Sequence, residues 1–468
     1  MSLPRLSPAS RPIWGARAHI EPNYDRSGRP GVVHLGLGAF HRAHQAMVFD
    51  RLLASGDMRW GVHGVGMTQP ALVDALRAQD GLYAVRVADA HGLRWAVPGA
   101  LWTLSVAATQ RAEVVHAMAA PNTRWVTLTV TEKGYTATLA QLLLEGLGLR
   151  QRRRLGGLTV ASCDNLQANG HKLKALLLEQ CDDVRLRSWM DAHCAFPCSM
   201  VDRIVPASSD PIRQAAQQQL GVQDPTALGV EAFWEWVIED HFADPSDGAR
   251  LAAHGVKVTA GVHAYEEAKL RMLNGSHTAM ALIGAITGRP HIADCIGHAP
   301  IRQFIERLIE REVAPHLARQ DWIAYRGALI QRFGNPYLRH SVHQIATDSS
   351  LKIPQRWPAS ILAQLAQGGL VDHHALAAAA WLRYGLGVDE SGQAYEIRDP
   401  DADRLRALAI DQRSAPRASV QALLSQTSWW GGELVHNSAW LERVCHWHQC
   451  ILDRGMDRTI EQLLGEIP

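Results

Sequence analysis

The sequence lacks a long apolar run and an excess of charge of either sign. Its longest apolar run, residues 375–382, is short and dominated by alanine, whereas a membrane-spanning helix needs about 20 apolar residues. Lysine and arginine number 47, against 46 for aspartate and glutamate, so no overall positive charge attracts nucleic acid. The N-terminus also lacks the apolar core of a signal peptide. We therefore expect no membrane and no nucleic acid among the partners.

Cysteine is scarce, and its seven residues form an odd count spread along the chain. This pattern argues against a disulfide framework, so we expect a cytoplasmic protein. His193, Cys194 and Cys198 are close in sequence, but no second ligand pair follows at the spacing of a zinc finger. The segment 445–450 (CHWHQC) lies in the terminal helical region, where such residues usually pack against neighbours. We therefore expect no metal.

The pattern of the first half indicates strands that alternate with helices. Hydrophobic residues make up 47% of the 468 residues and charged residues 20%, which excludes a disordered chain. Strands are predicted at 31–35, 60–66, 125–131 and 158–162, and helices at 41–54 and 171–180. This alternation predicts an α/β domain with a parallel sheet.

Beyond about residue 260 the periodicity is almost entirely helical. The predicted helices span 264–287, 300–318, 321–333, 358–367, 373–384, 402–410, 416–425 and 437–466. We expect a polar lead-in over residues 1–29, an α/β domain over 30–258 and a mostly α-helical domain over 259–468.

A glycine-rich turn follows the first predicted strand. In a dinucleotide-binding fold, the first glycine allows a tight turn and the second lets the backbone approach the pyrophosphate. Gly36 and Gly38 fit these roles, but His41 occupies the third glycine position, and no acidic residue follows the second strand. Alone, the segment is also compatible with an ordinary strand–helix turn. The candidate cofactor-binding residues are Gly36, Gly38, Ala39, Phe40, His41 and Arg42.

The predicted helix 264–288 carries polar side chains beside an apolar face. At 100° per residue, Lys269, His277 and Asn274 lie at about 0°, 80° and 140°. A lysine next to an apolar face is desolvated, which brings its pKa towards that of a general base. An amide and an imidazole on the same flank suit the polarisation of a carbonyl group. Taken alone, however, most lysines at such positions lie on the surface.

The segment Ser162-Cys163-Asp164-Asn165 directly follows a predicted strand. Ligands bind beyond the carboxyl ends of strands in open α/β sheets, but Asp and Asn also cap helices. We expect one of Asp164 and Asn165 to cap and the other to face a ligand. In segment 196–206, Asp202 and Arg203 are expected to form an ion pair or to supply a site carboxylate.

Six segments, in a fixed order along the chain, carry a resemblance to a known family. They are 34–46 (HLGLGAFHRAHQA), 129–135 (TVTEKGY), 162–170 (SCDNLQANG), 196–206 (FPCSMVDRIVP), 236–242 (WVIEDHF) and 269–277 (KLRMLNGSH). Together they resemble the mannitol dehydrogenase family of polyol-specific long-chain dehydrogenases. This resemblance implies a Rossmann-type N-terminal domain that binds NAD, a helical C-terminal domain and metal-independent oxidoreductase chemistry, with the substrate between the domains.

The resemblance also implies roles for single residues. Lys269, Asn274 and His277 match the catalytic signature K-x4-N-x2-H, and Asn165 pairs with Asn274 around the reacting oxygen. The residues that it places in the substrate pocket are Asp202 and Lys352.

Further segments resemble the fructuronate reductases, also called D-mannonate oxidoreductases, within this family. These segments are 333–340 (FGNPYLRH), 344–356 (QIATDSSLKIPQR) and 381–390 (WLRYGLGVDE). Mannitol dehydrogenases typically have an arginine at the position of Gln344. A substrate carboxylate needs a cationic partner, and the candidates are Lys133, Arg339, His340 and Lys352.

The sequence therefore predicts an NAD-dependent oxidoreductase that interconverts D-mannonate and D-fructuronate, with Lys269 as general acid and base. The alternatives are a mannitol 2-dehydrogenase or D-arabinitol dehydrogenase that acts on a neutral polyol, and a non-catalytic dinucleotide-binding protein. We expect the partner to be a small-molecule sugar acid or polyol, and the protein to be a monomer or a small homo-oligomer.

Overall fold

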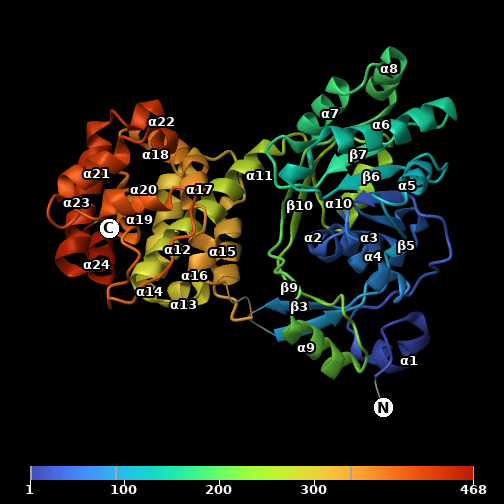
Figure 1. Cartoon of the computed structure of the whole chain (residues 1–468), viewed down its shortest axis with the longest axis horizontal. Coiled ribbons are helices and arrows are strands. Elements are labelled where there is room, and N and C mark those ends of the chain that lie inside the picture. The colour runs from blue at the N-terminus through green and yellow to red at the C-terminus, as the bar shows by residue number, and fades with distance from the viewer. Residues whose placement is uncertain (1–2, 90–91, 338–339, 467–468) are drawn as a thin grey trace. The chain divides into compact units, whose positions relative to one another are not determined.

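The computed structural model describes residues 3–89, 92–337 and 340–466. The chain divides into two compact units, Met1–His263 and Ala264–Pro468. The first unit holds every strand that Figure 1 labels, and the second is built from helices. This confirms the predicted fold class of a parallel α/β domain and a mostly α-helical domain.

A five-stranded parallel sheet forms the centre of the first unit. Its spatial order is β5 (Leu101–Val106), β2 (Val62–Gly66), β1 (Val32–Leu35), β6 (Trp125–Leu128) and β7 (Thr159–Ser162). The chain starts in the middle, runs outward through β2, and later returns to the other side of β1 with β6. The neighbouring strands β1 and β6 therefore form the point where the strand order reverses, which is where open α/β sheets bind ligands.

Side chains of the central strands alternate between two hydrophobic cores. Val32 and Trp125 belong to one core cluster, whereas the next residues, Val33 and Val126, belong to the other. Helices cover both faces, so the strands are buried throughout and lack the polar alternation of a half-exposed sheet. The helices of this unit are α1 (Arg11–Trp14), α2 (Ala39–Ala43), α3 (Gln45–Ala54), α4 (Pro70–Arg77), α5 (Arg111–Met118), α6 (Ala137–Arg152), α7 (Asn169–Glu179), α8 (Val184–His193), α9 (Asp210–Leu220) and α10 (Ser246–Ala253).

Two smaller sheets were not expected from the sequence pattern. One has the order β4 (Gly92–Ala96), β3 (Val85–Asp89) and β9 (Leu228–Glu231), and the other β11 (Lys257–Thr259), β10 (Glu235–Glu239) and β8 (Ser199–Asp202). Both join segments that are far apart in sequence, so local periodicity does not reveal them. The predicted lead-in also packs on this unit, because Leu6 and Trp14 are fully or almost fully buried in a third core cluster.

The second unit packs around tryptophan side chains. Buried tryptophans contact one another, with ring centroids 4.8 Å apart for Trp381 and Trp429 and 5.6 Å apart for Trp430 and Trp440. Among the described residues, no helix is both long and apolar enough to span a lipid bilayer. The α-helices of this unit are α11 (His263–Ala268), α12 (Ser276–Ile286), α13 (Ile292–Gly297), α14 (Ala299–Arg307), α15 (Trp322–Phe333), α16 (Val342–Ala346), α17 (Ser349–Arg356), α18 (Pro358–Ala366), α19 (Asp372–Tyr384), α20 (Ala402–Ala409), α21 (Pro416–Leu424), α22 (Thr427–Leu434), α23 (Ser438–Arg454) and α24 (Met456–Glu466).

Three predicted helices are not continuous. The helix predicted at 264–287 contains a π-helical segment, Lys269–Gly275, between α11 and α12. The helix predicted at 300–318 contains a second π-helical segment, Leu308–Val313. The helix predicted at 437–466 ends and restarts at Gly455, whose φ of 81° suits glycine better than other residues.

A buried carboxylate in the second π-helical segment joins two parts of the helical unit. Glu312 accepts hydrogen bonds from the backbone N–H groups of His373 and His374, at 2.7 and 3.0 Å, at the start of α19. Both imidazole Nδ1 atoms contact the same carboxylate, at 2.8 and 2.7 Å. The carboxylate thus satisfies two N–H groups that the first turn of a helix leaves without internal partners.

We predict that Glu312→Gln lowers the free energy of unfolding of the protein by about 3–5 kcal/mol, because it removes the charged partner of a buried network. Burial alone raises the pKa of Glu312, but hydrogen bonds from the two histidines outweigh this and lower the pKa to about 2. The stabilisation is therefore present above pH about 4.5 and is lost as the pH falls towards 2. Chemical denaturation of both proteins between pH 7 and pH 3 measures the difference.

The matched control is Glu310→Gln in the same segment, where the side chain is 54% exposed and pairs with Arg326. We expect a loss of less than about 1 kcal/mol, as for surface ion pairs. Equal losses for the two variants would contradict the assigned role of Glu312.

Candidate active site

The glycine-rich turn at the end of β1 approaches the end of β6 very closely. Gly36 has a φ of 92°, a conformation that favours glycine. A Cβ atom at Gly36 would lie 2.2 Å from the carbonyl oxygen of Thr129, which no side chain tolerates. The requirement for glycine at this position therefore comes from the fold itself.

Gly38, two residues further, is different. Its φ of −127° suits any residue, and a Cβ atom there would meet nothing closer than the carbonyl oxygen of Gly36, at 3.6 Å. The protein itself thus leaves room for a side chain at a partly exposed position in front of α2. A dinucleotide, whose pyrophosphate must approach the backbone at the second glycine, fits this observation.

The predicted cofactor residues after Gly38 fall into two groups. Ala39 and Phe40 are partly exposed, whereas His41 and Arg42 are buried. The His41 ring stacks on His34 of β1, with centroids 3.4 Å apart, and burial lowers the pKa of His41 well below its usual range. The Arg42 guanidinium donates to the carbonyl oxygens of Thr226, at 2.7 Å, and Gly38, at 3.2 Å. His41 and Arg42 are therefore buried residues that stabilise the turn.

The loops after β6 and β7 are joined by Asp164. Its carboxylate accepts a hydrogen bond of 2.6 Å from the backbone N–H of Thr131, a residue with a φ of 63°. Burial raises the pKa of Asp164, although the hydrogen bonds that it accepts oppose this. Asn165 is exposed beside it, and Lys133 is exposed in the short 3-10 helix Glu132–Gly134.

The expectation that Asp164 or Asn165 caps a helix is wrong for α7. The residue before that helix is Ala168, and no side chain caps it. Asp164 is used instead to hold the neighbouring loop, which leaves Asn165 as the polar side chain on the exposed side of the sheet edge. Asn165, Lys133 and the glycine turn thus all follow the carboxyl ends of β7, β6 and β1.

Asp202 is the last residue of β8, and its neighbour Arg203 has a structural role. Asp202 is buried and pairs in register with Glu235 of β10. The Arg203 guanidinium donates to the carbonyl oxygens of Glu231 and Ala43. Burial lowers the pKa of Arg203 to about 10.

The second group of predicted residues lies on the interrupted helix of the second unit. Lys269 begins the π-helical segment, Asn274 is near its end, and His277 lies in the first turn of α12. Because a π-helix joins residues five apart, Lys269 and Asn274 lie about one turn apart on the same side. The predicted separation of 140°, which assumes a regular α-helix, is therefore wrong. Lys269 and Asn274 are partly buried.

Two residues at the C-terminal end of α17 hold the backbone of this segment. Arg356 Nη1 donates to the carbonyl oxygen of Asn274, at 3.1 Å, and Trp357 Nε1, just after α17, donates to that of Gly275, at 3.1 Å. The hydroxyl of Thr278 also donates to the carbonyl oxygen of Asn274, at 2.9 Å. Local sequence patterns give no signal for the roles of Arg356 and Trp357, because no spacing rule links α17 with the segment that it supports.

His277 lies in a strongly cationic environment. It is buried, and its Nε2 atom has no hydrogen-bond partner among the described residues. The pKa of His277 is lowered well below its usual range, first by burial and then by its neighbours His340, Arg356, Arg332 and Lys352. A neutral imidazole nitrogen in this position suits a hydrogen bond to a ligand.

Two of the candidate carboxylate partners belong to this environment. The His340 ring lies 5.9 Å from that of His277, and burial followed by the charge of Arg332 lowers the pKa of His340. Lys352 Nζ donates to the carbonyl oxygens of Ile345 and Thr347, and burial lowers its pKa from the usual value. Arg339 lies outside the described residues.

Comparison with known proteins identifies both units. Residues 30–247 match the family model of the mannitol dehydrogenase Rossmann domain, and residues 261–452 match that of the mannitol dehydrogenase C-terminal domain. D-mannonate oxidoreductase of Escherichia coli (strain K12) is 36% identical, covering 97% of this chain and 98% of the relative.

Two solved structures share the fold over nearly the whole chain. Mannitol 2-dehydrogenase of Pseudomonas fluorescens, in a ternary complex with NAD and D-mannitol, has a TM-score of 0.80 and 28% identity, covering 99% of this chain and 100% of that chain. A substrate-free D-sorbitol dehydrogenase has a TM-score of 0.88 and 26% identity, covering 97% and 100%.

We predict that Gly38→Ala leaves the melting temperature nearly unchanged but weakens NADH binding at least about tenfold, because the added methyl group occupies the space of the ligand. Gly36→Ala is the contrasting variant, and we expect it to destabilise the first unit by more than about 1–2 kcal/mol through its positive φ and the clash. Thermal unfolding and fluorescence titration with NADH separate the two effects. Unchanged NADH binding in a stable Gly38→Ala variant would exclude this turn as the cofactor site.

Proposed function

The chain belongs to the mannitol dehydrogenase family, and from this premise we propose that it interconverts D-mannonate and D-fructuronate with NAD as the cofactor. The proposed reaction oxidises a secondary hydroxyl group of the sugar acid to a ketone, and it is reversible. Every protein group in it is a side chain, and no metal takes part.

The glycine turn supports NAD as the cofactor. Gly38 and the partly exposed Ala39 and Phe40 would hold the dinucleotide, whereas His41 and Arg42 hold the turn itself. When bound, NAD supplies an acceptor for the hydride that leaves the substrate carbon. The absence of a carboxylate after β2, where Met67, Thr68 and Gln69 follow Gly66, means that other groups must bind the ribose.

Lys269 is the proposed general base in oxidation. Its neutral amine takes the proton of the substrate hydroxyl, and in reduction its ammonium group returns a proton to the ketone oxygen. The partly buried position at the start of the π-helical segment supports this role. By the family resemblance, Asn165 and Asn274 donate hydrogen bonds to the same oxygen as negative charge develops, each worth roughly 3 kcal/mol.

The cationic environment of His277 is the observation that best supports a sugar acid as the substrate. Beyond burial, the groups that lower the pKa of His277 include the cations Arg356, Arg332 and Lys352. Asp348 and Asp399 offset part of this charge, because both raise the pKa of Lys352. A substrate carboxylate would offset the repulsion between the cations, and charged hydrogen bonds would orient it. A neutral polyol offers no such compensation. His277 itself stays neutral and orients the substrate through Nε2.

A neutral polyol remains the second candidate, because the Pseudomonas fluorescens relative forms its complex with D-mannitol. The resemblance to D-mannonate oxidoreductase extends over 97% of this chain at 36% identity, and the absence of an arginine at Gln344 also favours the acid. Any measured turnover of a sugar acid or polyol with NAD would exclude a non-catalytic role.

We predict that Lys269→Ala lowers kcat about 10²- to 10⁴-fold, the usual contribution of a general acid or base, while the NADH dissociation constant stays within about twofold. Lys269→Arg should fail equally, because arginine does not lose its proton. Lys174→Ala, which removes a partly exposed partner of Asp191, is the control and should keep full activity. Near-normal turnover of Lys269→Ala would contradict the role of Lys269.

We predict that NADH oxidation is at least about tenfold faster, in kcat/KM, with D-fructuronate than with D-fructose. The reason is that a charged hydrogen bond to a buried cation contributes about 1.5–3 kcal/mol. Only the carboxylate of D-fructuronate can form this bond. The two ketoses are compared at equal NADH concentration. A preference for D-fructose would show that the substrate is a neutral polyol.

Lys352→Met tests the origin of this preference. We expect kcat/KM to fall about tenfold or more for D-fructuronate and little for D-fructose, with NADH binding unchanged. Equal losses for both ketoses would show that Lys352 supports the fold through Ile345 and Thr347 and does not bind the carboxylate.

A further inference from the structure

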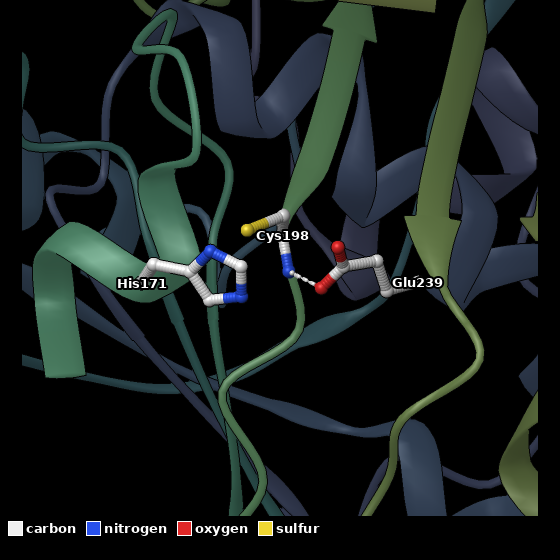
Figure 2. A group of neighbouring side chains, drawn as sticks. All are labelled: His171, Cys198 and Glu239. Carbon is white, nitrogen blue, oxygen red and sulfur yellow. Dashed lines mark hydrogen bonds between the residues drawn. The ribbon is translucent and has the colours of Figure 1, made fainter. Parts of the chain in front are cut away.

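Three potential metal ligands meet in the first unit on three different elements. His171 lies near the start of α7, Cys198 directly precedes β8, and Glu239 ends β10. One ligand atom of each lies within 4.8 Å of the other two, and Figure 2 shows the Cys198 sulfur directed towards the His171 ring. In the part of the chain that the structure describes, this is the one group of three such ligands.

The backbone holds these three residues together. Ser199 and Ile238 are partners in the antiparallel pair of β8 and β10, so Cys198 and Glu239 lie beside each other at its end. Asn169, in the same helix as His171, donates to the carbonyl oxygen of Ser199, at 2.7 Å, and accepts from its N–H, at 2.9 Å. The three ligand positions therefore follow from the backbone.

One ligand is already oriented. The backbone N–H of Cys198 donates a hydrogen bond of 2.7 Å to Glu239 Oε2, drawn as the dashed line in Figure 2. This contact fixes the plane of the carboxylate, as outer partners do around protein-bound metals. Cys198 is buried, Glu239 is partly buried and His171 is exposed, so an ion can enter from the side of His171.

We propose that His171, Cys198 and Glu239 bind one zinc ion, with water as the fourth ligand. A thiolate, an imidazole nitrogen and a carboxylate oxygen are the donors that zinc prefers. Ligands about 2.0–2.3 Å from a tetrahedral ion lie roughly 3.3–3.8 Å apart. The present separations lie within 4.8 Å, so small side-chain rotations would bring the three ligand atoms into this range.

The zinc ion would stand outside the proposed hydride transfer. It would tie α7, which follows the Asn165 loop, to β8, which ends at Asp202. Its effect is therefore to stabilise this part of the first unit, because an ion that binds only the folded state raises its stability. This inference does not depend on the substrate, and its test does not use activity.

The test uses Co²⁺ as a spectroscopic probe on the metal-free, full-length protein. We expect one equivalent to bind with a sulfur-to-cobalt charge-transfer absorption band, and Zn²⁺ to displace it. Cys198→Ser should abolish the band. His171→Ala, at an exposed position that leaves folding intact, should weaken binding at least about 10- to 100-fold, the range seen even for outer partners of metal sites. Zn²⁺ should also raise the melting temperature of the natural protein and not that of His171→Ala.

Cys450→Ser is the matched control. Cys450 and His446 form another cysteine–histidine pair, with 3.9 Å between sulfur and Nε2, and we expect this variant to keep the band. Absence of a thiolate band in the natural protein would overturn the proposal. A band that survives both Cys198→Ser and His171→Ala, or one that disappears in Cys450→Ser, would overturn it as well.

Discussion

The hydrogen bonds from α17 to the π-helical segment are the interaction on which the proposed chemistry depends. A π-helical turn is rare and is frequently found at functional sites, and its buried carbonyl groups need partners. Arg356 and Trp357 donate to the carbonyl oxygens of Asn274 and Gly275. Arg356 is partly buried, and this burial lowers its pKa to about 10. The contacts with the carbonyl oxygens replace part of its hydration. The helix of Lys269 is thereby held in a shape that its own residues do not favour.

This shape has a consequence for the proposed catalytic residues. In a regular α-helix, Lys269 and Asn274 would point in directions about 140° apart. The π-helical segment from Lys269 to Gly275 places residues five apart on one side, so one helix presents an amine and an amide together. The regular α12 then buries His277 one turn further. The proposed general base and the proposed hydrogen-bond donor therefore come from a single helical element, which keeps their separation constant.

Local sequence patterns predicted four of the five strands of the central sheet and most helices of the second unit. They missed β5 and most helices of the first unit, and they failed where distant segments interact. The strand at 31–35 and the glycine turn have strong local signals, and the structure places them at the reversal of strand order. The strands β8 and β10 are short, and their pairing depends on contacts between residues about 35 positions apart. The π-helical segment escaped prediction for a similar reason, since Arg356 and Trp357 support it from another helix. The group of His171, Cys198 and Glu239 has no spacing signal at all.

Positive charge is partly buried around His277. The charge of the proposed substrate therefore affects the stability of the site. Burial lowers the pKa values of Arg356 and Lys352, and both groups donate hydrogen bonds to carbonyl oxygens. Such groups repel one another, and this repulsion also keeps His277 neutral. A bound carboxylate reverses the sign of this interaction, because each cation then attracts it at short range. This arrangement of charge supports the proposal of an acid substrate over a neutral polyol of equal size.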